Sequence, residues 1–147
     1  MLKCIIYNPM TINYLAVVVA TVVQFVIGGA WYMSIFRHAW GEIHGFNSLS
    51  KEEQEKAQKG MGMQLGFQFL FTFITAFVFA LLSGGFPPEW NVFGEAGFFW
   101  LGFVVPTQAA AVMFGGTEKK WMMKKIAIMA GGSLACLEAA ATVFHFI

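Results

Sequence analysis

Residues 124–147 read KKIAIMAGGSLACLEAAATVFHFI, and this stretch decides the fold of the chain. After its two lysines it holds a single carboxylate, Glu138, in otherwise apolar sequence. About 20 apolar residues in an α-helix suffice to cross the hydrocarbon core of a bilayer, so the stretch predicts a membrane-spanning helix. A carboxylate inside such a helix is costly, which makes Glu138 the first candidate functional residue.

The composition of the whole chain agrees with a membrane location. Of 147 residues, 58% are hydrophobic and only 12% are charged, which leaves too little polar surface to cover a soluble core. The lipid bilayer is therefore the expected main partner. The formal net charge is +1 without a basic stripe, so nucleic-acid binding is not expected. Cys4 and Cys136 lie far apart, and no disulfide is expected.

Three further apolar stretches precede the last one. None contains lysine or arginine, and the third contains Pro106, which cannot donate a hydrogen bond to the carbonyl of Gly102 and so predicts a bend. Short connections join successive stretches, so we predict an all-α, up-down four-helix bundle that forms one transmembrane domain over residues 1–147. The four spans are expected at residues 11–36, 62–83, 95–115 and 124–147.

The most polar segment, residues 37–61, joins the first two spans. Ser50 and Glu53 have the spacing of a capping box, which predicts a short polar surface helix from there to about Lys59. The segment lacks an apolar stripe and is typical of a solvated connector. Before this helix come three side chains of metal-binding type. Their spacing matches no specific site, so neither a metal nor another cofactor is expected; they are His38, Glu42 and His44.

The cations are distributed unevenly between the two sides of the predicted bundle. Eight of the nine lysines and arginines lie in or beside the connections 37–61 and 116–123, and only Lys3 lies on the other side. By the positive-inside rule, both connections are cytoplasmic and both termini are outside, in a multi-pass protein of the cell membrane. Aromatic residues typical of the two membrane boundaries agree with this orientation; they are Trp31, Tyr32, Trp40 and Trp121 on one side and Tyr14 and Trp90 on the other.

The exit of the first span has the most distinctive sequence, Gly28-Gly29-Ala30-Trp31-Tyr32, followed by Phe36, Trp40 and Gly45. This pattern, with the charged connector and a proline in the third of four spans, resembles the family catalogued as domain of unknown function 1761 over nearly the whole chain. The resemblance implies a small four-span membrane protein without an assigned activity. It supplies no catalytic residue, and the bulky exit also has a structural interpretation as an interfacial anchor.

A polar layer is predicted near the middle of the membrane when the spans are aligned by depth. The candidate site in this layer comprises Glu138, Gln24, Gln108, Thr72 and Thr107. Because hydrocarbon disfavours an unsatisfied carboxylate, Glu138 is expected to need amide partners, with Gln24 and Gln108 as the obvious ones. His145 is expected on the same helix face nearer the outer surface, and together with Glu95 it forms a candidate outer relay.

Three interpretations of this layer follow. In the first, interhelical hydrogen bonds simply hold the spans together. In the second, Glu138 is a proton, cation or small-solute transport site, which requires a homo-oligomer or a cavity at Pro106. In the third, the chain is a lipid-binding or accessory protein that acts through small-residue helix faces on lipid, on a second copy or on another membrane protein. Catalysis is not expected, because serine, cysteine and histidine are too scattered to form a nucleophile with its base.

Overall fold

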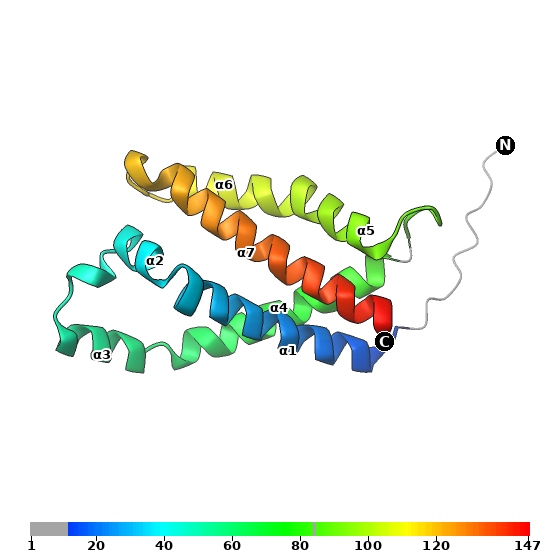
Figure 1. Ribbon diagram of the computed structural model, residues 1–147, viewed down its shortest axis with the longest axis horizontal. Coiled ribbons are helices and arrows are strands. Elements are labelled where there is room, and N and C mark those ends of the chain that lie inside the picture. The colour runs from blue at the N-terminus through cyan, green and yellow to red at the C-terminus, as the bar shows by residue number, and fades with distance from the viewer. Residues whose placement is uncertain (1–11, 84) are drawn as a thin grey trace.

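Four long helices form most of the described chain (Figure 1). The structure, a computed structural model, describes residues 12–83 and 85–147. The helices long and apolar enough to cross a membrane run over Tyr14–Ile35, Gly62–Ser83, Val92–Phe114 and Lys119–Phe146. The predicted all-α bundle of four spans is confirmed. Position 11, where the sequence predicts the first span to begin, lies outside the described residues.

The first span begins with a capped helix and ends in a π-helical turn. Asn13 caps α1 (Tyr14–Ala30), because its side-chain oxygen accepts an amide hydrogen bond at 3.1 Å. The backbone continues as the π-helical turn η1 (Trp31–Ile35), and Phe36 separates it from α2 (Arg37–Ile43). π-helical turns are rare in proteins, and those that occur are often found at functional sites. The exit of the first span is therefore a candidate region for function.

The connector between the first two spans contains three short helical segments, of which α2 is the first. Gly45, with φ of 69°, ends α2 in the left-handed region that favours glycine, and the single turn η2 (Phe46–Ser48) follows. The helix α3 (Lys51–Lys59) then begins with the predicted capping box. The amide of Glu53 donates to Ser50 Oγ at 3.3 Å, and the amide of Ser50 donates to the Glu53 carboxylate at 2.9 Å. The predicted surface helix is thus confirmed.

The third span is divided by a second π-helical turn. It comprises α5 (Val92–Phe99), the turn η3 (Trp100–Val104) and α6 (Val105–Phe114). It begins three residues earlier than predicted, because Asn91 caps it by accepting a hydrogen bond at 2.7 Å from the amide three residues on. Pro106 lies in the first turn of α6, directly after η3, where a missing amide is tolerated.

The fourth span, α7 (Lys119–Phe146), is the central helix of the bundle (Figure 1). It packs against α1 on one side and against α5 and α6 on the other, while α4 (Gly62–Ser83) packs against α1. Small residues dominate where these helices meet, which lets their backbones approach closely. The buried core comprises Val17, Ala20, Ala76, Phe79, Ala96, Leu137, Ala140 and Ala141.

Two tryptophans attach α7 to its neighbours, and each is the first residue of a π-helical turn. The indole nitrogen of Trp31 donates to the carbonyl of Ile128 at 2.9 Å, and that of Trp100 donates to the carbonyl of Ala130 at 2.7 Å. In hydrocarbon such a polar indole group needs a partner, and these carbonyls supply it. The two turns therefore deliver their tryptophans to the same short segment of α7 from opposite sides.

Gly131 and Gly132 make room for the ring of Trp31. A Cβ atom added at either glycine would lie 2.9 Å from a carbon of that ring, closer than real Cβ contacts. The small-residue face predicted on the last span is therefore partly occupied by a side chain of the same protein.

Candidate functional site

Two members of the predicted midplane layer lie in the interior of the bundle. Gln24 on α1 is 3% exposed and Thr72 on α4 is 8% exposed. The Thr72 hydroxyl donates to the carbonyl of Gln68 at 2.8 Å, one turn earlier in the same helix. The side-chain nitrogen of Gln24 is buried, and no acceptor for it is found among the described residues.

The third span contributes Gln108 and Thr107 to the predicted layer, and these two side chains have different surroundings. Gln108 contacts α7, where its side-chain oxygen accepts a hydrogen bond from the Ser133 hydroxyl at 3.4 Å. Thr107 is exposed, and its hydroxyl donates to the carbonyl of Phe103 at 2.6 Å. Both threonines of the layer thus donate their hydroxyls to carbonyls within their own spans.

Glu138 is half-buried on α7. In the described part of the chain, its carboxylate makes no hydrogen bond and no ion pair; the residue contributes only its backbone carbonyl, which accepts from Thr142 at 2.8 Å. Neither Gln24 nor Gln108 is hydrogen-bonded to it. No hydrogen bond joins any two of the five residues of the predicted layer.

The two residues of the predicted outer relay have different surroundings and are not bonded to each other. His145 is exposed near the end of α7, and its ring lies 5.7 Å from that of Phe93. Glu95 is 6% exposed, with one carboxylate oxygen that has no hydrogen-bond partner within residues 12–83 and 85–147. No hydrogen bond or ion pair between these two side chains is present in that range.

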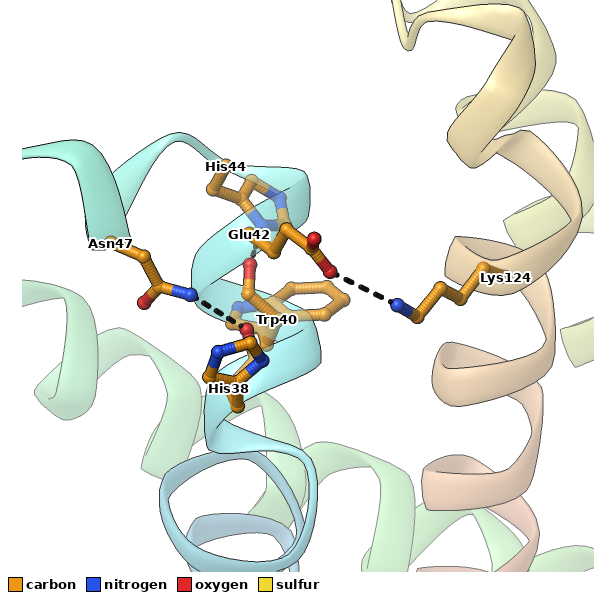
Figure 2. Close-up of polar contacts among 6 residues, drawn as sticks. All are labelled: His38, Trp40, Glu42, His44, Asn47 and Lys124. Carbon is orange, nitrogen blue, oxygen red and sulfur yellow. Dashed lines mark hydrogen bonds and ion pairs between the residues drawn. The ribbon is translucent and has the colours of Figure 1, made fainter.

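The clearest polar junction lies at the other end of the bundle, which we call the lysine-bearing end because it holds α2, α3 and the start of α7. Here the Lys124 ammonium of α7 pairs with the Glu42 carboxylate of α2 at 3.2 Å (Figure 2). Both side chains are partly exposed, at 44% and 42%. The pair joins two elements that are 82 residues apart in the sequence.

Local hydrogen bonds hold α2 in the position that presents Glu42 (Figure 2). The ring nitrogen Nδ1 of His44 lies 2.9 Å from the carbonyl of Trp40, so this nitrogen carries the proton. The side-chain amide of Asn47 donates to the carbonyl of His38 at 2.9 Å and so fastens the following turn back onto the helix. Among the described residues, no group of three histidine, cysteine or acidic side chains is placed to hold a metal ion.

Two tryptophan rings orient the lysines of α7. The Lys124 ammonium lies 5.0 Å from the centroid of the Trp121 ring, and the Lys125 ammonium lies 5.9 Å from that of Trp40. Cation–π contacts of this length are attractive, most strongly where water is excluded. Lys124 therefore lies between a carboxylate and an aromatic ring.

A cavity of about 260 Å³ opens beside Lys124. Its walls are otherwise apolar and come from both sides of the junction, Phe36 and Ala39 from the exit of the first span and Ala127 and Ile128 from α7. The bond from Trp31 to the carbonyl of Ile128 holds the two walls together at 2.9 Å. An apolar cavity with one ammonium at its edge suits an amphiphile that has an anionic head.

Sequence reasoning did not identify this cavity. It recognised the cations of this end and named Glu42, but only among three side chains of metal-binding type whose spacing matches no specific site. The missed signal was the pair of small residues, Ala39 and Ala127, one three residues after Phe36 and the other three residues after Lys124. Two such positions leave space between helices only if the helices meet there.

Comparison with known proteins places the chain in a family. The searches of curated proteins and of solved structures gave no match. The model of one family, described as a protein of unknown function (DUF1761), matches residues 15–145, which include all four spans almost completely. The chain, a membrane-protein-like bundle of four apolar helices, therefore belongs to the DUF1761 family.

Proposed function

We propose that this protein binds an anionic phospholipid at its lysine-bearing end, in the cavity between Phe36, Ala39, Ala127 and Ile128. The observation that carries the proposal is the Lys124 ammonium at the edge of an otherwise apolar cavity of about 260 Å³. This volume is close to the lower limit of typical small-molecule pockets, about 300 Å³. It suits part of a lipid, with the phosphate at Lys124 and the adjoining apolar portion against the alanines.

The membrane itself would supply this ligand. We propose that the lysine-bearing end faces the cytoplasm, because cations are enriched in cytoplasmic connections. The cytoplasmic leaflet carries anionic lipids, and basic pockets between spans on that side bind their head groups. Three more lysines near the start of α7 add to the local positive potential; they are Lys119, Lys120 and Lys125.

Glu42 would act as an internal competitor for the lipid phosphate. It accepts a hydrogen bond from Lys124 at 3.2 Å. An ammonium has three donors, so Lys124 can hold a phosphate and a carboxylate together, but the two anions repel each other. Binding would therefore loosen the contact between α2 and α7.

The test compares lipid binding by matched lysine variants. Delipidated protein in detergent is titrated with phosphatidylglycerol or phosphatidylcholine, and native mass spectrometry gives the dissociation constants. We expect preference for phosphatidylglycerol and about a fivefold loss in Lys124→Ala, the effect of roughly 1 kcal/mol per cation near an anionic head group. The matched control is Lys120→Ala, which removes the same charge from a residue paired with Glu118 at 2.9 Å and outside the cavity wall.

Two further variants separate the cavity from general surface charge. Glu42→Gln removes the competitor and is expected to tighten phosphatidylglycerol binding severalfold. Ala127→Leu fills the cavity and is expected to weaken binding, whereas Ala57→Leu on the exposed surface of α3 serves as its control. Equal losses in Lys124→Ala and Lys120→Ala, or binding that is indifferent to Ala127→Leu, would refute the proposal.

A binding function agrees better with the described geometry than transport or catalysis does. A transport site would need a continuous path of polar groups across the membrane. The predicted layer residues are not hydrogen-bonded to one another. We also propose no catalytic role, because the cavity wall includes no nucleophile and no general base other than Lys124. The polar interior is then best understood as helix–helix attachment.

A further inference from the structure

The cavity at the lysine-bearing end is closed by a different kind of contact at each of its two ends. At the deeper end, the rings of Trp31 and Phe36 lie 4.8 Å apart, and the Trp31 indole donates to the carbonyl of Ile128 at 2.9 Å. At the end nearer water, the contact is the ion pair between Lys124 and Glu42 at 3.2 Å. The cavity walls lie between these two contacts.

Two sets of three residues face each other here, one at the exit of the first span and one on α7. Each set follows three- or four-residue steps, so its members share one side of the chain. The sets are Phe36, Ala39 and Glu42, and Lys124, Ala127 and Ile128. The two segments run antiparallel, because the numbers rise from Trp31 to Glu42 while those of their partners fall from Ile128 to Lys124.

The two closing contacts differ in how easily they separate. The indole–carbonyl bond of Trp31 lies within the span, where a hydrogen bond that opens is not replaced by one to water. The side chains of Lys124 and Glu42 are partly exposed, so water and salt compete for their pair, and exposed ion pairs contribute little to stability. The cavity therefore has a stable contact at its deeper end and a weak one at its water end.

The helix α2 can move as a unit with the turn that follows it. The hydrogen bonds of His44 and Asn47 remain within the connector (Figure 2). The polar contacts between α2 and α7 in the described part of the chain are the ion pair and the approach of the Lys125 ammonium to the Trp40 ring at 5.9 Å. Before α2, the backbone of Phe36 leaves helical geometry, with φ of −108° and ψ of 14°. Residues at the ends of elements are the usual hinges.

We propose that α2 is a latch that swings about Phe36 and is held closed over the cavity by the ion pair between Glu42 and Lys124. When the pair separates, the water end of the cavity opens and the Lys124 ammonium becomes free for another anion. A lipid phosphate that displaces Glu42 would thus open the cavity that its lipid enters. This regulation rests on the proposed lipid site, whereas the latch itself can be tested without lipid.

Thiol labelling at the cavity wall tests the latch in delipidated protein in detergent. Cys4 and Cys136 are replaced by serine, Ala39→Cys supplies the single thiol, and its rate of reaction with a small neutral maleimide reports opening of the cavity. We expect Glu42→Gln to speed labelling about two- to fivefold, the range that follows from the strength of an exposed ion pair. In 1 M sodium chloride, where the Debye length is about 3 Å, the parent protein should approach the rate of Glu42→Gln.

Two further variants control for charge alone. Glu118→Gln removes a carboxylate from a pair with Lys120 at 2.9 Å that lies within one short segment, so it should leave the labelling rate unchanged. Exchanging the charges, as Glu42→Lys with Lys124→Glu, should restore slow labelling because the attraction between α2 and α7 returns. The proposal is overturned if Glu42→Gln labels at the parent rate, if Glu118→Gln accelerates labelling equally, or if the exchanged protein labels as fast as Glu42→Gln.

These results distinguish the latch from lipid binding. If labelling depends on the ion pair but phosphatidylglycerol binds no more tightly than phosphatidylcholine, the latch stands and the proposed function fails. If phosphatidylglycerol is preferred but labelling is indifferent to the ion pair, the lipid site stands and the latch is refuted.

Discussion

The Trp31 indole packs closely on Gly131 and Gly132, which are about 100 residues away in the sequence. Its ring atoms would lie 2.9 Å from a Cβ at either glycine, and its nitrogen bonds to the carbonyl of Ile128. The indole thus has an apolar surface against the glycines and a satisfied polar group. It also borders the helix segment that forms one wall of the cavity.

Replacing Gly132 by alanine is expected to destabilise the fold. The added methyl group would overlap Trp31, and overpacking of this kind costs about 1–3 kcal/mol. Alanine is the better helix former by at most about 1 kcal/mol, so the clash should prevail. The measurement is the thermal unfolding midpoint in detergent, which should fall.

The control for this substitution is Gly66→Ala in α4. Apart from the chain neighbours of Gly66 and the nearby backbone of the same helix, no atom lies within 4 Å of a Cβ built there, so this variant gains helix propensity without a clash. Its midpoint should stay unchanged or rise. Similar behaviour of the two alanine variants would show that the Trp31 contact does not constrain the helix.

Among the elements, α3 depends most on local interactions, because it has no buried residue. The Ser50 hydroxyl donates to the Glu53 carboxylate at 2.7 Å, and the Ser50 amide donates to the same oxygen at 2.9 Å. These hydrogen bonds, first from the side chain and then from the backbone, lower the pKa of the Glu53 carboxyl below its usual value of 4.5. The helix should therefore respond to acid.

The expected pH dependence follows from the direction of this shift. Because the pKa of Glu53 is lower in the folded helix than in the unfolded chain, its stabilisation is complete above the unfolded value and is lost as the pH falls through the folded value. An NMR titration of the Glu53 side-chain carbon in micelles should give a midpoint below 4.5. Ser50→Ala should raise that midpoint, and an unchanged midpoint would contradict the capping-box account.

Local signals explain why these elements could be predicted from sequence. Hydropathy predicts the four spans, and the spacing of Ser50 and Glu53 predicts the start of α3, because both depend on neighbouring residues. The third span begins at Val92 rather than at position 95, because its start is set by the Asn91 cap and not by the apolar pattern. The two π-helical turns could not be predicted, because their tryptophans bond to carbonyls 97 and 30 residues away.

The whole bundle brings the connections 37–61 and 115–118 to one end, as the ion pair between Glu42 and Lys124 requires (Figure 1). This arrangement separates a cation-rich end from an end with few charges. The distribution of lysine and arginine along the sequence predicted that these two connections share one side of the bundle. It could not predict the cavity, which depends on Ala39 meeting Ala127 across two helices.

The orientation in the membrane can be measured with single cysteines. In a protein without native cysteines, Ala57→Cys on α3 and Glu89→Cys between the second and third spans are both exposed positions. If the lysine-bearing end is cytoplasmic, a membrane-impermeant maleimide should label only position 89 in intact cells. After permeabilisation it should label both positions. Labelling of position 57 in intact cells would reverse the orientation and with it the proposed lipid source.

The π-helical turn η1 also has a consequence for comparing relatives of this chain. A π turn holds more residues than the α-helical turn it replaces, and an α-helix rotates by about 100° per residue. Deleting one residue within Trp31–Ile35 would therefore swing α2 around its axis and turn Glu42 away from Lys124. The number of residues between Gly28-Gly29 and Glu42 thus sets the direction in which Glu42 points. In a relative that differs by one in this count, we expect a differently shaped cavity.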